Sequence, residues 1–229
     1  MDNQTGFILG STLGLLSLLI FFLIFLFFRF KALQTKILKK NKGKEYEKQV
    51  NEKLLQWAIN NQSFFINSSI LKKDNLLFEV DSILITKKAV IVIEIKSLNG
   101  FIKGDFYSNY WTKTSFNHQL KIYSPVFQNK MHIIKLQKLL NMPVPFLSLI
   151  IFSSKTKSLD ITNYFDYQDD TLMTFESDMM FKLDLLMQQH TNYEISILDQ
   201  KRIFYSIEQC IDNSKTNLKK IKKSIKNEQ

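Results

Sequence analysis

Asp81, Glu94 and Lys96 lie on two expected strands within residues 78–96, a stretch that is rich in apolar residues. Asp81 lies in the segment FEVDSILIT, and Glu94 and Lys96 lie in the segment AVIVIEIK. Because a β-strand alternates its side chains between two faces, Glu94 and Lys96 share one face. A charge inside such an apolar strand costs free energy unless it is paired or bound to a metal ion. These three residues therefore form the first candidate site.

The two strands that carry these residues are expected to pair as a hairpin around Lys87 and Lys88. Equal offsets from that turn place residue 81 opposite residue 94, with Cβ atoms about 4.5–5.5 Å apart. Two carboxylates at that distance repel each other unless a cation neutralises them, and Mg²⁺ or Mn²⁺ suits oxygen ligands. Lys96 would lie beside the ion and act on a water molecule or a phosphate. The alternative is a solvated strand face with an ordinary Glu94–Lys96 ion pair.

Hydrophobic periodicity predicts the elements that would position this site. Helical spacing predicts helices at residues 44–60 and 125–140, the second with a Ser124 N-cap and Pro125 in its first turn. The order helix, strands, helix, strand predicts an α/β domain with a mixed sheet flanked by helices. The expected strands are residues 64–71, 76–86, 89–95, 101–105, 146–153 and 171–175, and further helices are expected at 177–189 and 199–211.

The N-terminal segment is uniformly apolar. Residues 7–28 contain no charge, and as a helix they would span about 33 Å, enough for a hydrocarbon core of about 30 Å. We therefore expect a transmembrane helix rather than a signal peptide or a buried core helix. Seven positive charges and no acid follow in residues 29–44. The positive-inside rule then predicts a single-pass protein of the cell membrane, with its N-terminus outside, its domain cytoplasmic, and residues 29–44 on anionic lipid.

The composition limits the organisation and the partners of the chain. The net charge of +10 over 229 residues fits a polyanionic partner, either nucleic acid or an anionic membrane surface. The single Cys210 excludes an intrachain disulfide framework and a Cys-cluster zinc site. We predict a membrane anchor at 1–29, a basic linker at 30–43, one domain at 44–212 and a basic tail at 213–229.

Several short motifs together resemble the nuclease-related domain (NERD) family, within the restriction-endonuclease-like PD-(D/E)xK superfamily. They occur in the family's order over residues 42–154, and the resemblance implies a core of the order α-β-β-β-α-β. The motifs are Gly43-x-x-x-Glu47-x-x-Val50, Glu79-Val80-Asp81, Ile93-Glu94-Ile95-Lys96, Gly100-x-Ile102 with Trp111, and Pro125-x-x-Gln128-Asn129. Two positions depart from the pattern, since Tyr46 replaces the family's usual Gly and Val80 replaces a Pro that is frequent in the superfamily.

The resemblance also implies a role for each matching residue. Asp81 and Glu94 would bind the metal ion, Mg²⁺ or Mn²⁺, and Lys96 would act on the attacking water. Glu47 matches the acid of the family's first helix and would be an outer metal ligand. Gln128 matches a polar position that faces the site from the N-terminus of the second helix, a place that suits an anion.

The leading hypothesis is a membrane-anchored, metal-dependent nuclease that hydrolyses phosphodiester bonds of DNA or RNA. The alternative is a catalytically silent nuclease-fold module that binds nucleic acid or acts as a membrane scaffold, and a lipid-surface protein is a third possibility. His132 shows no paired metal-ligand spacing and is expected to be structural or at the surface. Trp111 could stack on bases, with core packing as the alternative. The candidate nucleic-acid contacts are Lys87, Lys88, Lys103, Lys113 and Trp111.

Overall fold

The computed structural model describes most of the chain, which divides into two units, residues 1–45 and 46–229. The predicted basic tail at 213–229 lies outside the described residues. Side chains of residues 3–18, 36, 39 and 40 are also outside the description. The described residues are 3–116, 118–166, 170–189 and 193–212.

The first unit consists of residues from α1 (Asn3–Asn60), so the segment predicted as a linker, 30–43, is helical. No helix in the described part of the chain is long and apolar enough to cross a membrane. Residues 7–18 of the predicted anchor lie outside the residues whose side chains are described. The structure therefore does not support the predicted transmembrane helix at 7–28 or the lipid contact at 29–44.

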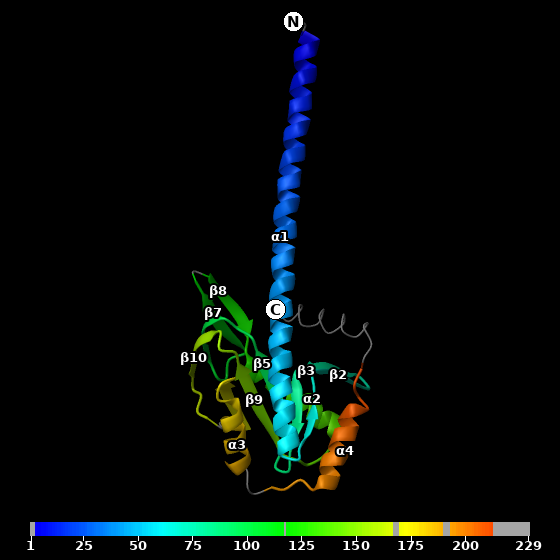
Figure 1. Cartoon of the computed structure of the whole chain (residues 1–229), viewed down its shortest axis with the longest axis vertical. Helices are drawn as coiled ribbons and strands as arrows, with labels where there is room; N and C mark the ends of the chain where they lie inside the picture. Colours follow the sequence, from blue (N-terminus) through cyan, green and yellow to red (C-terminus); the bar gives the residue numbers. More distant parts are fainter. Residues whose placement is uncertain (1–2, 117, 167–169, 190–192, 213–229) are drawn as a thin grey trace. The chain divides into compact units, whose positions relative to one another are not determined.

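A five-stranded mixed sheet forms the centre of the second unit (Figure 1). The first three strands in its order pair antiparallel, and the last three pair in parallel. The structure confirms the expected α/β class with a mixed sheet flanked by helices. The strand order is β1 (Phe64–Ile66), β4 (Ser82–Ile85), β5 (Val90–Lys96), β9 (Phe146–Phe152) and β11 (Thr171–Phe175).

Helices cover both faces of this sheet, and the alternation along β5 assigns each side chain to a face. Its isoleucines at 91, 93 and 95 pack in one core with residues 46–58 of α1 and with α3 (Met179–Gln189). Val90 and Val92 pack in the opposite core with α2 (Pro125–Leu140) and α4 (Ile197–Glu208). Glu94 and Lys96 follow Val92 with the same period, so they belong to the α2 face.

A second sheet carries Gly100, which belongs to one of the motifs, and Gly104. At Gly100, φ is +94° and a Cβ atom would lie 2.3 Å from the Thr114 carbonyl oxygen, and at Gly104 a Cβ would lie 2.2 Å from the Trp111 ring. Only glycine allows these approaches. The sequence predicted β6 of this sheet but not its three other strands. The strand order is β10 (Thr156–Thr162), β6 (Gly100–Asp105), β7 (Tyr110–Ser115) and β8 (His118–Tyr123).

Two of the predicted strands are each broken in two. The segment 64–71 divides into β1 and β2 (Ser69–Lys73), because Asn67 turns the chain and its side chain accepts a hydrogen bond from the Ser68 N–H. The segment 76–86 divides into β3 (Leu76–Val80) and β4, with a bend at Asp81. β2 and β3 form a separate antiparallel pair. The break at Asp81 decides how this acid reaches the site.

The boundaries of α2 agree with the prediction. The Phe127 N–H donates to the Ser124 hydroxyl, which is the expected N-cap, and the helix ends at Asn141 in a left-handed conformation. The last helix begins earlier than predicted, because Ser196 caps α4 through the Asp199 N–H.

Candidate active site at the end of strand β5

The hairpin of β4 and β5 has the register that the sequence predicted. Ser82 pairs with Ile93 and Ile85 pairs with Val90. The next pair in this register would be residues 81 and 94, but the bend at Asp81 ends the ladder. The Asp81 carboxylate crosses to β5 instead, where its Oδ2 accepts a hydrogen bond of 2.7 Å from the Ile95 N–H. Asp81 therefore reaches the site from a bend and not from a strand position.

Glu94, Lys96 and Gln128 form a connected row on the α2 face of the sheet. Glu94 is buried, with 1% of its side chain exposed, and its Oε1 lies 2.5 Å from the Lys96 Nζ. Lys96 also donates a hydrogen bond of 2.9 Å to the Gln128 Oε1. Gln128 lies in the first turns of α2. The Ser124 N-cap sets where this helix begins and therefore which way the Gln128 side chain points. The structure thus brings together three of the predicted site residues.

The pKa of Asp81 is changed by burial and by the charged groups around it. Burial raises the pKa of Asp81 well above its usual range, and the nearby Glu94 raises it further. The Lys96 ammonium and the Ile95 N–H act in the opposite direction, and Glu47 adds a smaller rise. A cation close to these acids would favour their ionised forms.

The pKa of Lys96 is also raised, but here burial acts against the change. Burial alone would lower the pKa of Lys96, but the carboxylates of Glu94 and Asp81 outweigh burial and the pKa is raised. Glu47 contributes to this rise. Lys96 is therefore an ammonium at neutral pH.

Helix α1 supplies the support beneath Asp81. Glu47 lies near enough to act on the pKa values of both Asp81 and Lys96. One turn later, the buried Asn51 donates hydrogen bonds to Asn67 Oδ1 at 2.8 Å and to the Asp81 carbonyl at 3.3 Å. Asn51 therefore holds the bend that aims Asp81. The sequence analysis missed it, although its spacing of four from Glu47 places both on one helix face.

His132 is a second residue whose position the sequence analysis did not foresee. It follows Gln128 by one turn of α2, and its Nδ1 lies 3.6 Å from Glu94 Oε2. Burial lowers the pKa of His132, with further lowering by Lys96 and Lys135 against an opposing effect of Glu94. The imidazole is therefore neutral at pH 7. His132 was expected to be structural or at the surface, and the surface alternative is wrong, since its side chain is 13% exposed.

A metal ion has a partial set of ligands at this site. Among the described residues, no group of three or more His, Cys, Asp or Glu side chains is arranged to hold an ion. Asp81 and Glu94 nevertheless offer carboxylate oxygens that influence each other electrostatically, and Glu94 Oε2 is buried without a hydrogen-bond partner in the described structure. These oxygens fit a divalent cation, and Glu47 lies within electrostatic range of Asp81.

An open cavity of about 650 Å³ begins at this row, and Lys96 and Gln128 line it. Its opposite wall comes from the β7–β8 hairpin. There the Tyr110 and Tyr123 rings meet edge to face at 5.7 Å, and the Lys121 Nζ lies 4.0 Å from the Tyr110 ring centre. The wall facing Lys96 is therefore aromatic and cationic.

The residues that the sequence predicted to contact nucleic acid are not among those that line this cavity. Lys87 and Lys88 lie beyond the opposite end of β5 from Lys96, and the six residue steps from Val90 to Lys96 alone span about 20 Å at about 3.3 Å per residue. Lys103 pairs with Asp160 at 3.3 Å. Lys113 lies on β7.

Trp111 is a core residue and not a base-stacking residue. Its side chain is 1% exposed, and its Nε1 donates a hydrogen bond of 2.9 Å to the Asp105 carbonyl. Gly104 lies directly against its ring. The role of this tryptophan in the family-like motif is therefore packing of the second sheet.

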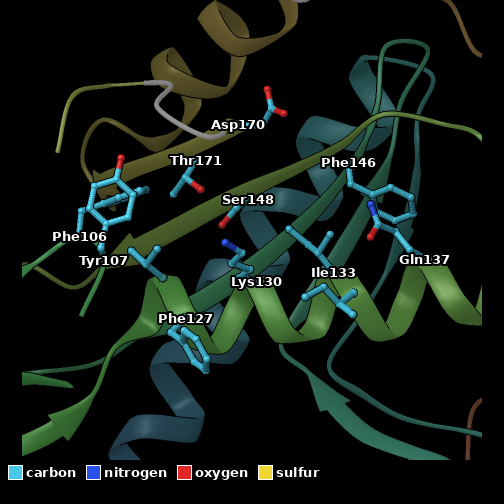
Figure 2. A pocket seen from close by; sticks show the side chains of 12 residues that line it. Phe106, Tyr107, Phe127, Lys130, Ile133, Gln137, Phe146, Ser148, Asp170 and Thr171 are labelled. Carbon is cyan, nitrogen blue, oxygen red and sulfur yellow. The ribbon is translucent and has the colours of Figure 1, made fainter. Parts of the chain in front are cut away.

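A second cavity, of about 340 Å³, lies on the other side of α2 (Figure 2). Figure 2 shows Lys130 from the helix and Ser148 and Thr171 from the strands pointing into one space. Residues 130, 134 and 137 are turned away from residues 128 and 132 by the helical period. The predicted site residues do not line this cavity.

Part of the chain is similar to a known protein family. Residues 42–153 match the family model of the nuclease-related domain. An uncharacterized protein of Bacillus anthracis is 28% identical over 116 residues, which is 50% of this chain and 54% of that relative. This chain thus spans about half the length of the curated relative it matches, and no solved structure matches it. The site built by Asp81, Glu94 and Lys96 lies within the segment that is similar to the nuclease-related domain family.

Proposed function

We propose that the second unit is a metal-dependent nuclease domain of the nuclease-related family, hydrolysing phosphodiester bonds of DNA or RNA. The observation that carries the proposal is the Lys96 ammonium, held between Glu94 and Gln128 at the wall of an open cavity. The match of residues 42–153 to the nuclease-related domain supports the reaction class.

The proposed restriction-endonuclease-like core consists of α1, β4, β5, α2 and β9. This order reproduces helix, strands, helix, strand, and the acids come from the bend before β4 and from β5. The fold likeness is a proposal that rests on this order and on the motifs.

Each residue then has a proposed role. Asp81 and Glu94 hold a divalent cation, Mg²⁺ or Mn²⁺, with Glu47 as an outer ligand. The cation, when bound, neutralises charge on the phosphate and acidifies a water molecule. Lys96 keeps a proton at Nζ and stabilises negative charge on the phosphate in the transition state. Gln128 orients that ammonium through its 2.9 Å hydrogen bond.

The β7–β8 wall is the proposed contact for the substrate. Tyr110 and Tyr123 offer ring surface for bases, and Lys121 offers a cation for a phosphate. All three line the cavity that contains Lys96. They replace the lysines that the sequence analysis proposed.

Incubation of the purified chain with DNA or RNA and with Mg²⁺ or Mn²⁺ tests the proposal. We expect cleavage by the unmodified chain and its loss in Asp81→Asn, Glu94→Gln and Lys96→Ala. Lys130→Ala, which changes a lysine on the other side of α2, is the matched control and should cleave normally. Cleavage that survives all three site substitutions would show that the site lies elsewhere.

A silent binding module is the second candidate function. The observation that favours it is the absence of a three-ligand group among the described His, Cys, Asp and Glu side chains. Calorimetry separates the two functions. A folded chain that binds nucleic acid but neither Mn²⁺ nor Mg²⁺ would establish the binding module.

We also propose a localisation, which rests on the sequence pattern alone. The uncharged residues 7–28 followed by the basic residues 29–44 favour membrane attachment with the second unit in the cytoplasm. Fractionation with a carbonate wash tests attachment. Recovery of the chain in the washed supernatant would refute it.

A further inference from the structure

The cavity beside α2 (Figure 2) lies at the edge of the helical layer that covers this face of the central sheet. On this face α2 packs against β5 and β9, and α4 packs against β1 and β4. β11 continues the sheet beyond β9. The cavity, of about 340 Å³, is lined by residues of α2, β9 and β11 and by Phe106 and Tyr107. Its volume falls in the range of about 300–1,000 Å³ that is usual for small-molecule sites.

The sheet side of the cavity carries a buried hydroxyl group with a proton to donate. Ser148 on β9 and Thr171 on β11 are neighbours in the ladder, and both are buried. The Ser148 hydroxyl accepts a hydrogen bond of 2.9 Å from the Asn129 amide, and it donates none within the described part of the chain. Figure 2 shows the Ser148 side chain pointing into the cavity. Because a hydroxyl both accepts and donates, Ser148 indicates a ligand with a hydrogen-bond acceptor.

Aromatic side chains lie at both ends of the cavity. Phe106 and Tyr107 stand at one end and Phe146 at the other, as Figure 2 shows. Helix α2 contributes the apolar side chains of Val126 and Ile134 to the lining. Aromatic side chains pack favourably against other planar rings in offset or edge-to-face arrangements. The walls therefore suit a flat aromatic molecule of one or two rings.

The charged residues of the lining favour an uncharged ligand. Lys130 and Asp170 both line the cavity, and both are exposed. They carry opposite charges, so together they add no net charge to the cavity. A charged ligand would lose its hydration against the apolar walls without an excess of opposite charge to compensate it. The cavity therefore lacks the chemistry of an anion or cation site.

We propose that this cavity binds an uncharged heteroaromatic molecule of one or two rings, the chemical class of the nucleobases. The Ser148 hydroxyl donates a hydrogen bond to an acceptor atom on the edge of the ring. The inference does not rest on the proposed function, because Asp81, Glu94 and Lys96 do not line this cavity. It concerns binding alone and assigns no reaction to the cavity.

Two ligands of the same size test the hydrogen bond. Benzimidazole and indole are both flat, two-ringed and uncharged at pH 8, but only benzimidazole has a ring nitrogen that accepts. Ligand-observed NMR titration of the full chain should show saturable binding of benzimidazole, with indole about 2–12-fold weaker, the range of one net hydrogen bond. Ser148→Ala should weaken benzimidazole by the same factor and change indole by less than about twofold. Adenine should displace benzimidazole from the unmodified chain.

A pair of tryptophan variants tests the location. Ile134→Trp places a large ring in the cavity from α2, so it should abolish binding of both ligands. Leu198→Trp adds the same ring at an exposed position of α4 that does not line the cavity, so it should bind both ligands normally. Ser148→Ala removes a single oxygen atom and keeps the test decisive even where Ile134→Trp does not fold.

Several outcomes would overturn the inference without touching the nuclease proposal. They are the absence of saturable benzimidazole binding to the unmodified chain, and binding that persists in folded Ile134→Trp. Equal losses of benzimidazole and indole in Ser148→Ala would also overturn it, because the hydroxyl would then not donate to the ligand. Tighter binding of the anion benzoate than of benzimidazole would contradict the uncharged class. Conversely, loss of cleavage activity in the Asp81, Glu94 or Lys96 variants should leave benzimidazole binding unchanged.

Discussion

The two sides of helix α2 differ in the kind of cavity they border. One side presents Gln128 and His132 to buried charges at the end of β5. The other side presents Lys130 and Gln137 to a cavity that is otherwise largely apolar (Figure 2). An apolar cavity with a few polar groups is the usual first hypothesis for a ligand site. Here the displaced pKa values lie on the other side, and such displacements mark functional sites more directly.

The two sides of α2 differ because the start of the helix determines the direction in which each of its side chains points. The helix begins at the Ser124 cap, and residues four apart then fall on one face. Asn129 fixes the helix on the sheet, because its side-chain amide donates to the Val92 carbonyl at 2.8 Å and to the Ser148 hydroxyl at 2.9 Å. Substitutions on the two sides of one helix therefore make matched pairs.

The largest effect is expected from Lys96→Ala. Loss of the ammonium should lower the rate of phosphodiester cleavage by about 10²–10⁴-fold, because in the proposed mechanism this charge stabilises the reacting phosphate. Gel or fluorescence assays of cleavage measure it. A decrease below about threefold would contradict the role of Lys96 and weaken the distinction between the two sides of α2.

Asp81→Asn should have the next largest effect, in two directions. Mn²⁺ affinity should fall at least about 100-fold, since even outer partners of metal ligands contribute about 10–100-fold. The metal-free chain should become more stable at neutral pH, because burial raises the pKa of Asp81 and the ionised acid disfavours the folded state. Thermal unfolding with and without Mn²⁺ measures both effects.

The pH dependence of that stability gain has a definite sign. Below about pH 3.9, the ordinary pKa of aspartate, Asp81 is protonated in both the folded and the unfolded chain, so the substitution should change little. The advantage of Asp81→Asn should grow as pH rises from there toward the raised pKa of the folded state. A variant that is destabilised across this range would show that Asp81 is not held as described.

The sequence predicted the hairpin of the site because local rules fix it. The turn at Lys87 and Lys88 sets the offset, and Ser82 pairs with Ile93 as that offset requires. The bend at Asp81 was not predictable in this way, since it depends on Asn51 and Asn67, far away in the sequence. The spacing in the sequence therefore identified Asp81 and Glu94, but it did not predict the bend that directs the Asp81 carboxylate.

His132 illustrates a limit of another kind. Its spacing from Gln128 indicates a shared helix face, but no pattern in the sequence says which strand that face meets. The docking of α2 through Asn129 decides this, and it is a tertiary contact. The β7–β8 hairpin was missed because its strands mix polar and aromatic residues without a continuous apolar face. The proposed contacts of Tyr110 and Lys121 were therefore not among the predicted ones.

Substitutions in that wall should have moderate effects on binding. Tyr110→Ala should weaken single-stranded nucleic acid binding by about 5–150-fold, the range of about 1–3 kcal/mol that one stacked base contributes. Lys121→Ala should weaken binding less and reduce its salt dependence, since one phosphate contact is lost. Fluorescence anisotropy at several salt concentrations measures both. Equal losses in Lys87→Ala, at the far end of β5, would show that the cavity is not the binding surface.

The smallest effect is expected on the apolar side of α2. Lys130→Ala should leave cleavage, metal affinity and nucleic acid binding within about twofold, because exposed lysines interact weakly through solvent. The lysine lies only two residues from Gln128, yet the helical period turns it to the cavity in Figure 2. Because Lys96→Ala and Lys130→Ala remove the same charge, a large effect of the second would mean that net charge, and not the geometry at β5, governs activity. Only a marked difference between these two lysine variants is consistent with a site on one side of the helix.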